Sequence, residues 1–413
     1  MEDAARILKT FARRAFRRAV SDADVEPFLG LVQAALDQKR SFEQAVRVGL
    51  QAVLVSPQFL FLHEKPGTLD EFALASRLSY FLWNNMPDEM MSDLASMGKL
   101  QDPVVLKEEI GRALRSPKAM GFIESFVTQW LGTRSLGREF VPDAKLFPKY
   151  SLDIELQGDV RLQPIVFFQS VVSSNGSLLD LLDSNWTIVT RTLARAYFPG
   201  LKTRADNTAQ PHREEIPADI HRGGLLSMPA VLAVSSYPYR TSPVLRGKWV
   251  LETLLGTPPP APPPNVPPIE EHEGAQPKTM REKLAQHREN AVCASCHSRI
   301  DPIGFALENF DPIGQWRTED AGKPIDNSGE LPDGTKFEGP EQLKAVLLQR
   351  RDLFIRNLTN RMLGYALGRG LTRQDSCAVD SIVEQVIASG YKSHALIEGI
   401  VMSQPFRYQA GHK

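Results

Sequence analysis

Residues 70–83 read DEFALASRLSYFLW, and this stretch decides the fold class. From Leu74 to Leu82 its apolar side chains recur every three or four residues. This period places them on one face of an α-helix, whereas a half-buried strand alternates at every second residue. The stretch therefore predicts an amphipathic helix that begins near Asp70 and packs on a core.

Helical patterns of the same kind cover most of the chain. The clearest lies at residues 42–55, and Ser56-Pro57 ends it, because a proline disfavours the helical conformation of the residue before it. We expect further helices at residues 279–292, at 341–367 with a break, and at 378–401. Strand patterns are few. The sequence thus predicts a mainly α protein built from several consecutive helical modules.

The chain is long enough for more than one core, since it has 413 residues. We place the modules at residues 1–65, 66–200, 201–322 and 323–413. The third contains a proline-rich stretch at residues 256–268 that must be extended, because proline fixes φ and restricts its preceding residue. We interpret it as a semi-rigid spacer on one domain's surface, with recognition by an aromatic groove of a partner as the alternative.

Composition excludes several classes of protein. Hydrophobic residues make up 42% of the chain and charged residues 23%, which is ordinary for a globular protein. The net charge of −1 gives no reason to expect a nucleic-acid partner. No apolar run of the length of a membrane span exists, so we expect no transmembrane segment. The start at Met1 lacks the basic and then apolar pattern of a secretory signal.

The most specific motif is Cys293-Ala294-Ser295-Cys296-His297, the spacing of a c-type haem attachment site. Two thiols one helical turn apart can form thioethers with the two vinyl groups of haem, and the adjacent imidazole can ligate the iron. The chain has three cysteines. The motif therefore predicts one covalently attached haem c, held by Cys293, Cys296 and His297, in a loop-rich, cytochrome c-like third module.

Three other readings of the cysteines remain. A zinc site would need Cys293, Cys296, Cys377 and a histidine such as His287 to converge. A dithiol redox motif or a short structural disulfide would use the two motif cysteines alone, although a redox motif normally follows a strand, and here a helical pattern precedes it.

Residues after the motif suit a haem pocket. A carbonyl at or just before Pro302 is our candidate acceptor for the Nδ1 hydrogen of His297. Phe305 and Trp316 belong to a group of apolar side chains that would exclude water from the iron, with ordinary core packing as the alternative. Arg299 and Arg317 are candidates to pair with the haem propionates.

The sixth iron ligand separates an electron carrier from a haem enzyme. Met362 lies on a helical face, and its thioether would give a His/Met cytochrome of raised potential. A methionine in an apolar stripe is also a common core residue. Met402, His287 and an open position are the alternatives. An open position would let oxygen or peroxide reach the iron.

Five segments carry a resemblance to a known family. They are ARRAFRR at residues 12–18, LASRLSYFLW at 74–83, RTSPV through LLGTPPP at 240–260, the motif region at 293–317, and LGYALGR at 363–369. In this order they make the chain resemble the planctomycete-type multidomain c-type cytochromes, which are built from a run of domains of unknown function.

The resemblance implies four consecutive, mostly helical modules in an exported protein, with the Cys-Ala-Ser-Cys-His segment as the haem site of the third. Members of the family usually carry a secretory segment and often an upstream cytochrome module. This chain shows neither, so we expect it to be a piece of a longer periplasmic or otherwise extracytoplasmic protein. In the family, the position of Met362 is often occupied by other residues.

Three functions follow as hypotheses. The first is electron transfer between the haem and a redox partner protein or an upstream cytochrome module. The second is a haem-c peroxidase or oxygenase with an open distal iron position. The third is a ligand-binding protein that binds its ligand through the helical first half and the region from Tyr239 to Trp249, with a haem that only stabilises the fold.

Overall fold

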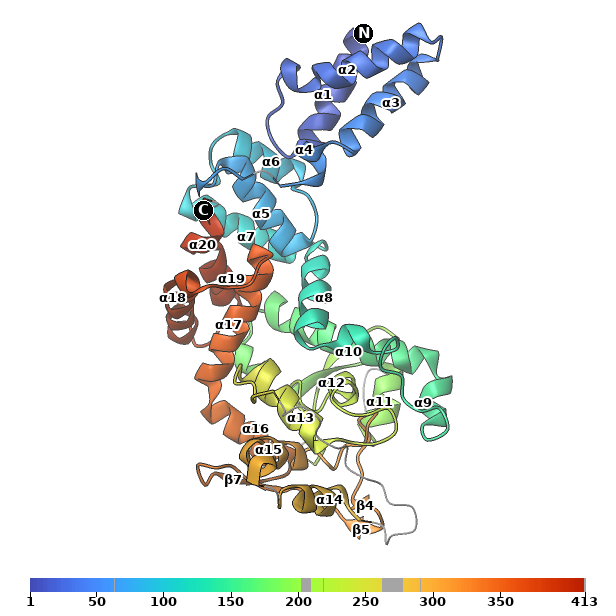
Figure 1. Ribbon diagram of the computed structural model, residues 1–413, viewed down its shortest axis with the longest axis vertical. Coiled ribbons are helices and arrows are strands. Elements are labelled where there is room, and N and C mark those ends of the chain that lie inside the picture. The colour runs from blue at the N-terminus through green and yellow to red at the C-terminus, as the bar shows by residue number, and fades with distance from the viewer. Residues whose placement is uncertain (63, 202–208, 218, 262–277, 290, 412–413) are drawn as a thin grey trace. The chain divides into compact units, whose positions relative to one another are not determined.

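The computed structural model describes residues 1–62, 64–201, 209–217, 219–261, 278–289 and 291–411. Within these ranges the predicted fold class is confirmed, because twenty α-helices dominate and the strands are short (Figure 1). The strands form four antiparallel pairs of two. None of the helices in these ranges combines the length and the apolar character that crossing a bilayer requires.

The chain divides into two compact units, each assembled from separate stretches of sequence. Unit 1 consists of Met1–Phe122, Leu363–Ala378 and Ile397–Lys413. Unit 2 consists of Ile123–Met362 and Val379–Leu396. The two units are described separately below.

Unit 1 begins with a small helical bundle. Its helices are α1 (Glu2–Phe16), α2 (Asp22–Asp37), α3 (Phe42–Leu54) and α4 (Pro57–Leu60). The predicted helix at 42–55 is confirmed, and the Ser41 side chain caps it by accepting a hydrogen bond from the Gln44 amide. The core includes Leu8 and Val32, which are fully buried.

Helix α5 (Glu71–Trp83) is the helix predicted from the opening stretch. The Asp70 carboxylate caps it by accepting a hydrogen bond from the Ala73 amide, and Asn84 ends it in the left-handed conformation with φ 53°. The predicted apolar face is buried, with Leu74 and Leu82 at 0% exposure. The remaining elements that lie wholly in unit 1 include α6 (Glu89–Ser96), α7 (Pro103–Arg115), α20 (Gln404–Arg407), β1 (Gly67–Thr68) and β8 (Tyr408–Gln409).

Arg77 of α5 joins the first and last segments of unit 1. Its guanidinium pairs with Glu64, and Nη1 donates to the carbonyl oxygens of Pro405 at 3.1 Å and Phe406 at 2.8 Å. Beside this contact, β1 pairs with β8. These hydrogen bonds satisfy backbone acceptors of residues more than 300 positions away in the sequence, which explains why unit 1 is discontinuous.

Unit 2 contains the motif. Its principal elements are α9 (Pro148–Leu152), α10 (Ile154–Ser173), β2 (Trp186–Val189), α11 (Arg191–Tyr197), β3 (His212–Glu215), α12 (Pro229–Val234), α13 (Pro243–Trp249), α14 (Met280–His287), α15 (Ala291–Phe305), β4 (Glu319–Asp320), β5 (Lys323–Pro324), β6 (Ser328–Glu330), β7 (Lys336–Glu338) and α16 (Gly339–Gln349). Four helices cross the division between the units: α8 (Ala119–Trp130), α17 (Arg351–Leu367), α18 (Ser376–Ala388) and α19 (Ser393–Met402). One core cluster of unit 2 joins Val189, Tyr197 and Ile313.

Two predicted helix boundaries are wrong. The helix expected at 279–292 ends at His287, and the motif instead lies in α15. The helix expected at 378–401 is two helices, α18 and α19 (Ser393–Met402), because Gly390 and Tyr391 adopt positive φ between them. The predicted break in 341–367 is confirmed at Arg350, between α16 and α17. Most of the proline-rich stretch lies outside the described residues.

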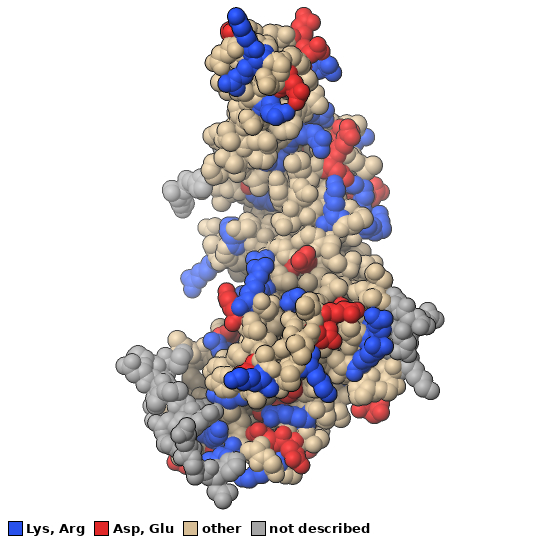
Figure 2. Space-filling model, turned by 90° about the vertical axis from the view of Figure 1, so that its right-hand side faces the viewer, with Lys and Arg blue, Asp and Glu red and all other residues tan. Residues whose placement is uncertain are grey.

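Charged side chains of both signs are spread over the surface. Figure 2 shows lysines and arginines interspersed with aspartates and glutamates on the face that it draws. This distribution agrees with the nearly balanced composition of 48 basic and 49 acidic residues.

Candidate functional site

The three motif side chains lie in the first half of α15. Cys293 and Cys296 are three residues apart and Cys293 and His297 four apart, so the helix places them on one face. Both thiols are free and half-buried. The pair is thus accessible to a ligand while its backbone is fixed by helical hydrogen bonds.

The imidazole of His297 is oriented by Asp301, one helical turn further on. Its Nδ1 lies 2.8 Å from Asp301 Oδ1, and Asp301 is completely buried. A carboxylate can only accept a hydrogen bond, so Nδ1 carries a proton in this contact, and in the neutral imidazole Nε2 then keeps its lone pair. This replaces the role that we predicted for a Pro302 carbonyl, because the carbonyl of Pro302 accepts from the Ala306 amide at 3.3 Å within the helix end.

Two residues at the end of α14 complete the surroundings of this pair. Arg288 Nε lies 3.7 Å from Asp301 Oδ2, and that oxygen is buried without a hydrogen-bond partner among the described residues. The His287 ring lies edge-to-face against His297, with 5.0 Å between the ring centroids. The site therefore holds two imidazoles, one carboxylate and one guanidinium next to the two thiols.

Helix α15 is positioned by close contact with α13. Gly247 of α13 lies against the backbone of Ile300, and Gly304 of α15 lies against the backbone of Pro243. A Cβ at either glycine would overlap the facing carbonyl oxygen. The two helices can therefore cross at this separation because both contact positions lack a side chain.

A buried arginine on α13 binds the chain that follows α15. Arg246 is completely buried, and its guanidinium lies 3.6 Å from the carboxylate of Glu308. Its other acceptors are backbone oxygens, those of Leu307 at 2.6 Å, Phe310 at 2.7 Å and Asp311 at 2.9 Å. Burial lowers the pKa of Arg246 to about 10, although the negative charge of Glu308 acts in the other direction. Burial also raises the pKa of Glu308. Removal of one partner would leave the other buried without compensation.

Arg317, which we predicted to pair with a propionate, donates its hydrogen bonds to groups of the protein itself. Its Nη2 donates to the Glu308 carboxylate at 2.9 Å and to the Thr241 hydroxyl at 3.1 Å, and Nη1 lies 3.3 Å from Asp320. Its Nε donates to the carbonyl oxygen of Glu308. These contacts make Arg317 a part of the charge cluster behind α15. Arg299 is exposed on α15, one turn after Cys296.

The two predicted aromatic residues have different surroundings. Phe305 is buried, packs with Met280 and Leu284 of α14, and carries the Arg281 guanidinium 3.9 Å from its ring centroid. Trp316 is 39% exposed and stacks on His221 at 4.1 Å between centroids. Phe305 thus belongs to the contact between α14 and α15, and Trp316 to the loop that follows.

The candidates for a sixth ligand lie on different helices. Met362 is buried in α17, at the end of the first segment of unit 2 and one turn before Tyr365. Met402 ends α19 in unit 1. His287 is the candidate for which the structure gives a direct contact with His297. His287 thus lies beside His297, and the identity of a sixth ligand stays a prediction.

The zinc reading of the cysteines has no support in the described ranges. Within them, no group of three or more histidine, cysteine, aspartate or glutamate side chains is arranged to hold a metal ion. Cys377 is exposed on α18.

Several residues of the site were missed by sequence analysis. Asp301 stands four residues after His297, which is the spacing for a contact on one helical face, and this signal was available. Burial of Arg246 had no such signal, since it depends on how α13 meets a loop more than 60 residues away.

Four domain families match the chain in sequence. Each is described as a protein of unknown function: DUF1595 at residues 3–64, DUF1592 at 69–198, DUF1588 at 222–320 and DUF1585 at 333–406. Helix α15 and its motif lie inside the DUF1588 match, a family also named PSCyt3.

No curated protein and no solved structure matches the chain. The four family matches are the run of domains that the resemblance to planctomycete-type multidomain cytochromes implied. The chain therefore carries a run of four domain families of unknown function, with the motif inside the third of them in sequence order.

Proposed function

We propose that the protein is an extracytoplasmic c-type cytochrome with one covalent haem, which exchanges electrons with a redox partner. One observation carries the proposal. Cys293, Cys296 and His297 share a helical face, and the Nδ1 of that histidine is held by a buried carboxylate. Free, half-buried thiols beside an oriented imidazole fit the needs of haem attachment.

Each residue has a distinct task in this proposal. Cys293 and Cys296 would hold the macrocycle through thioethers, and His297 would hold the iron through its imidazole. Asp301 holds the imidazole in the required tautomer and orientation through Nδ1. When bound, haem supplies a centre that gains and loses one electron.

The proposed location and partner follow from the chemistry of attachment. Thioether formation belongs to the export-linked maturation of cytochromes, so the protein would be matured outside the cytoplasm. The partner would be a separate redox protein or a cytochrome module of the same longer protein. Electron transfer needs no substrate to reach the iron, so side chains alone could hold it.

A haem-c peroxidase or oxygenase is the second candidate function. The observation in its favour is the hydrogen bond from His297 to Asp301, since a carboxylate partner increases the electron donation of the imidazole to iron. This function requires an open sixth position.

Optical spectra of the matured protein test the two functions. We expect a six-coordinate, low-spin spectrum in the wild type, because His287 lies beside His297 and would hold the iron together with it. His287→Ala should then give a high-spin ferric spectrum, and Met362→Leu should leave the spectrum unchanged. Loss of a weak far-red sulfur-to-iron band in Met362→Leu would assign Met362 instead, and a high-spin wild type would contradict the carrier and support the enzyme.

Asp301→Asn should raise the reduction potential without preventing haem attachment. The amide has the same shape but no negative charge, so it stabilises the ferric state less than the carboxylate does. A hydrogen bond to a charged group contributes about 1.5–3 kcal/mol, which corresponds to roughly 65–130 mV for one electron.

A redox titration of haem-loaded protein measures this shift. Asp333→Asn, at an exposed carboxylate paired with Arg350, is the matched control and should leave the potential unchanged. An unchanged potential in Asp301→Asn would show that this carboxylate does not act on the iron through His297.

A further inference from the structure

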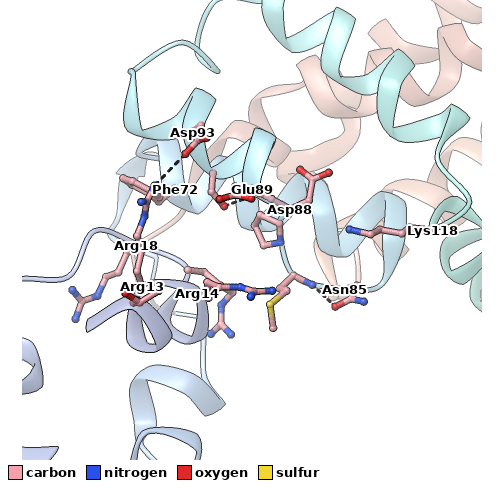
Figure 3. Close-up of a pocket in the computed structure, with 14 residues that line it drawn as sticks. Arg13, Arg14, Arg18, Phe72, Asn85, Asp88, Glu89, Asp93 and Lys118 are labelled. Atoms are coloured by element: carbon pink, nitrogen blue, oxygen red, sulfur yellow. Dashed lines mark hydrogen bonds and ion pairs between the residues drawn. The ribbon is translucent and has the colours of Figure 1, made fainter. Parts of the chain in front are cut away.

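A pocket of about 420 Å³ lies in unit 1, where the C-terminal half of α1 faces the start of α6 (Figure 3). Its lining includes Arg13 and Arg14 of α1 and Arg17, the C-terminal cap of α1. Lys118 lies on the opposite side. We propose that this pocket binds a small organic anion that carries a carboxylate or phosphate group on a single ring. The proposal does not depend on haem attachment, because it concerns the other unit.

The lining has more positive than negative charge. Five basic side chains line it against the three carboxylates of Asp88, Glu89 and Asp93. Two of these carboxylates already have partners, since Asp93 pairs with Arg13 at 3.2 Å and Asp88 receives both terminal nitrogens of Arg112 at 2.8 and 2.9 Å. The carboxylates of the pocket therefore do not neutralise its remaining cations.

Arg18 is neutralised from outside the pocket, where it pairs with Asp24 at 2.8 Å. Three cations then remain, Arg14, Arg17 and Lys118, and Glu89 is the remaining carboxylate of the lining. Among the described residues, neither Arg14 nor Lys118 forms an ion pair. A bound anion would supply the missing charge.

Arg17 is held rigidly in the lining. It caps α1 in the left-handed conformation with φ 54°, and its Nη2 donates to the carbonyl oxygens of Gln58, Phe59 and Phe61 at 3.0–3.4 Å. These acceptors fix the guanidinium without cancelling its charge, because a carbonyl oxygen carries no net charge. A fixed cation loses little conformational freedom when a ligand binds.

Lys118 provides a second positioned charge. Its Nζ lies 4.7 Å from the centroid of the Trp83 ring, which holds the side chain by a cation–π contact. Its charge also acts on Asp88. Burial raises the pKa of that carboxyl, but hydrogen bonds from Arg112 and the Met91 amide, together with the charges of Arg112 and Lys118, outweigh burial and leave the pKa below its ordinary value. Since Arg112 already binds Asp88, Lys118 remains available to a ligand.

The size and apolar part of the lining define the ligand class. A volume of about 420 Å³ is within the range of small-molecule sites. Phe72, Met86 and Pro87 supply apolar surface beside the cations. Arginine forks recognise carboxylate and phosphate groups through paired hydrogen bonds. The pocket thus suits an anionic group attached to a ring rather than a bare inorganic ion.

Calorimetric titration of the full chain at low salt tests the proposal, with glucuronate, glucose 6-phosphate and neutral glucose as probes. We expect at least one charged probe to bind about tenfold or more tightly than glucose, and the two charged probes distinguish carboxylate from phosphate. In the double variant Arg14→Gln with Lys118→Gln, the Kd for that probe should rise about tenfold or more. Both side chains are exposed, so the fold should persist.

Lys99→Gln, at an exposed lysine of unit 1 outside the lining, is the matched control and should not change the Kd. Equal binding of glucose and the charged probes would overturn the proposal. So would failure of both charged probes to bind, or a Kd that is unchanged in the folded double variant.

Discussion

Replacing both Cys293 and Cys296 with serine should abolish covalent haem attachment completely. Serine hydroxyls have nearly the shape of the thiols but do not form thioethers with vinyl groups. The two side chains are half-buried on α15, so the apoprotein should keep its helical content. Denaturing gel electrophoresis with haem staining, on protein exported together with the attachment machinery, measures the result.

Cys377→Ser is the control for this experiment. Cys377 is exposed on α18, away from the motif in sequence, and its replacement should leave haem staining at the wild-type level. Haem that stays bound to the denatured double serine variant would refute the assignment of the two motif thiols.

Gly304→Ala should strongly destabilise unit 2. The added Cβ would overlap the carbonyl oxygen of Pro243, and neither backbone can yield without separating α13 from α15. Overpacking usually costs about 1–3 kcal/mol, and we expect about 3 kcal/mol or more here because both contacting groups are backbone. Urea unfolding followed by circular dichroism measures the change in the free energy of unfolding.

Gly158→Ala provides the matched control on α10. A Cβ at Gly158 would meet no other atom within 4 Å. Since alanine favours a helix over glycine, this variant should be unchanged or more stable by about 0.5–1 kcal/mol. If Gly304→Ala unfolds like Gly158→Ala, the close crossing of α13 and α15 is not as described.

Local patterns predicted the helices whose signals lie within a few residues. The period of α5 and the capping side chains Ser41 and Asp70 act over one or two turns, so the sequence alone was sufficient for them. The motif likewise predicted which side chains share a face of α15. By contrast, the helix expected at 279–292 failed because its periodic pattern did not reveal where α14 ends.

Features that depend on distant contacts could not be predicted in this way. The return of residues 404–409 to Arg77 and the burial of Arg246 both join segments far apart in the sequence. The two glycines of the α13–α15 crossing look like ordinary helix glycines until the facing backbones are known. Met362 shows the same limit, because an apolar stripe alone does not distinguish an iron ligand from a core residue.

The most direct test of the central claim is the intact mass of the protein after export and maturation in a bacterial periplasm. The account predicts a mass equal to the polypeptide plus one haem, with the haem located on the peptide that contains Cys293 and Cys296. A mass equal to the polypeptide alone, with both thiols free, would contradict it.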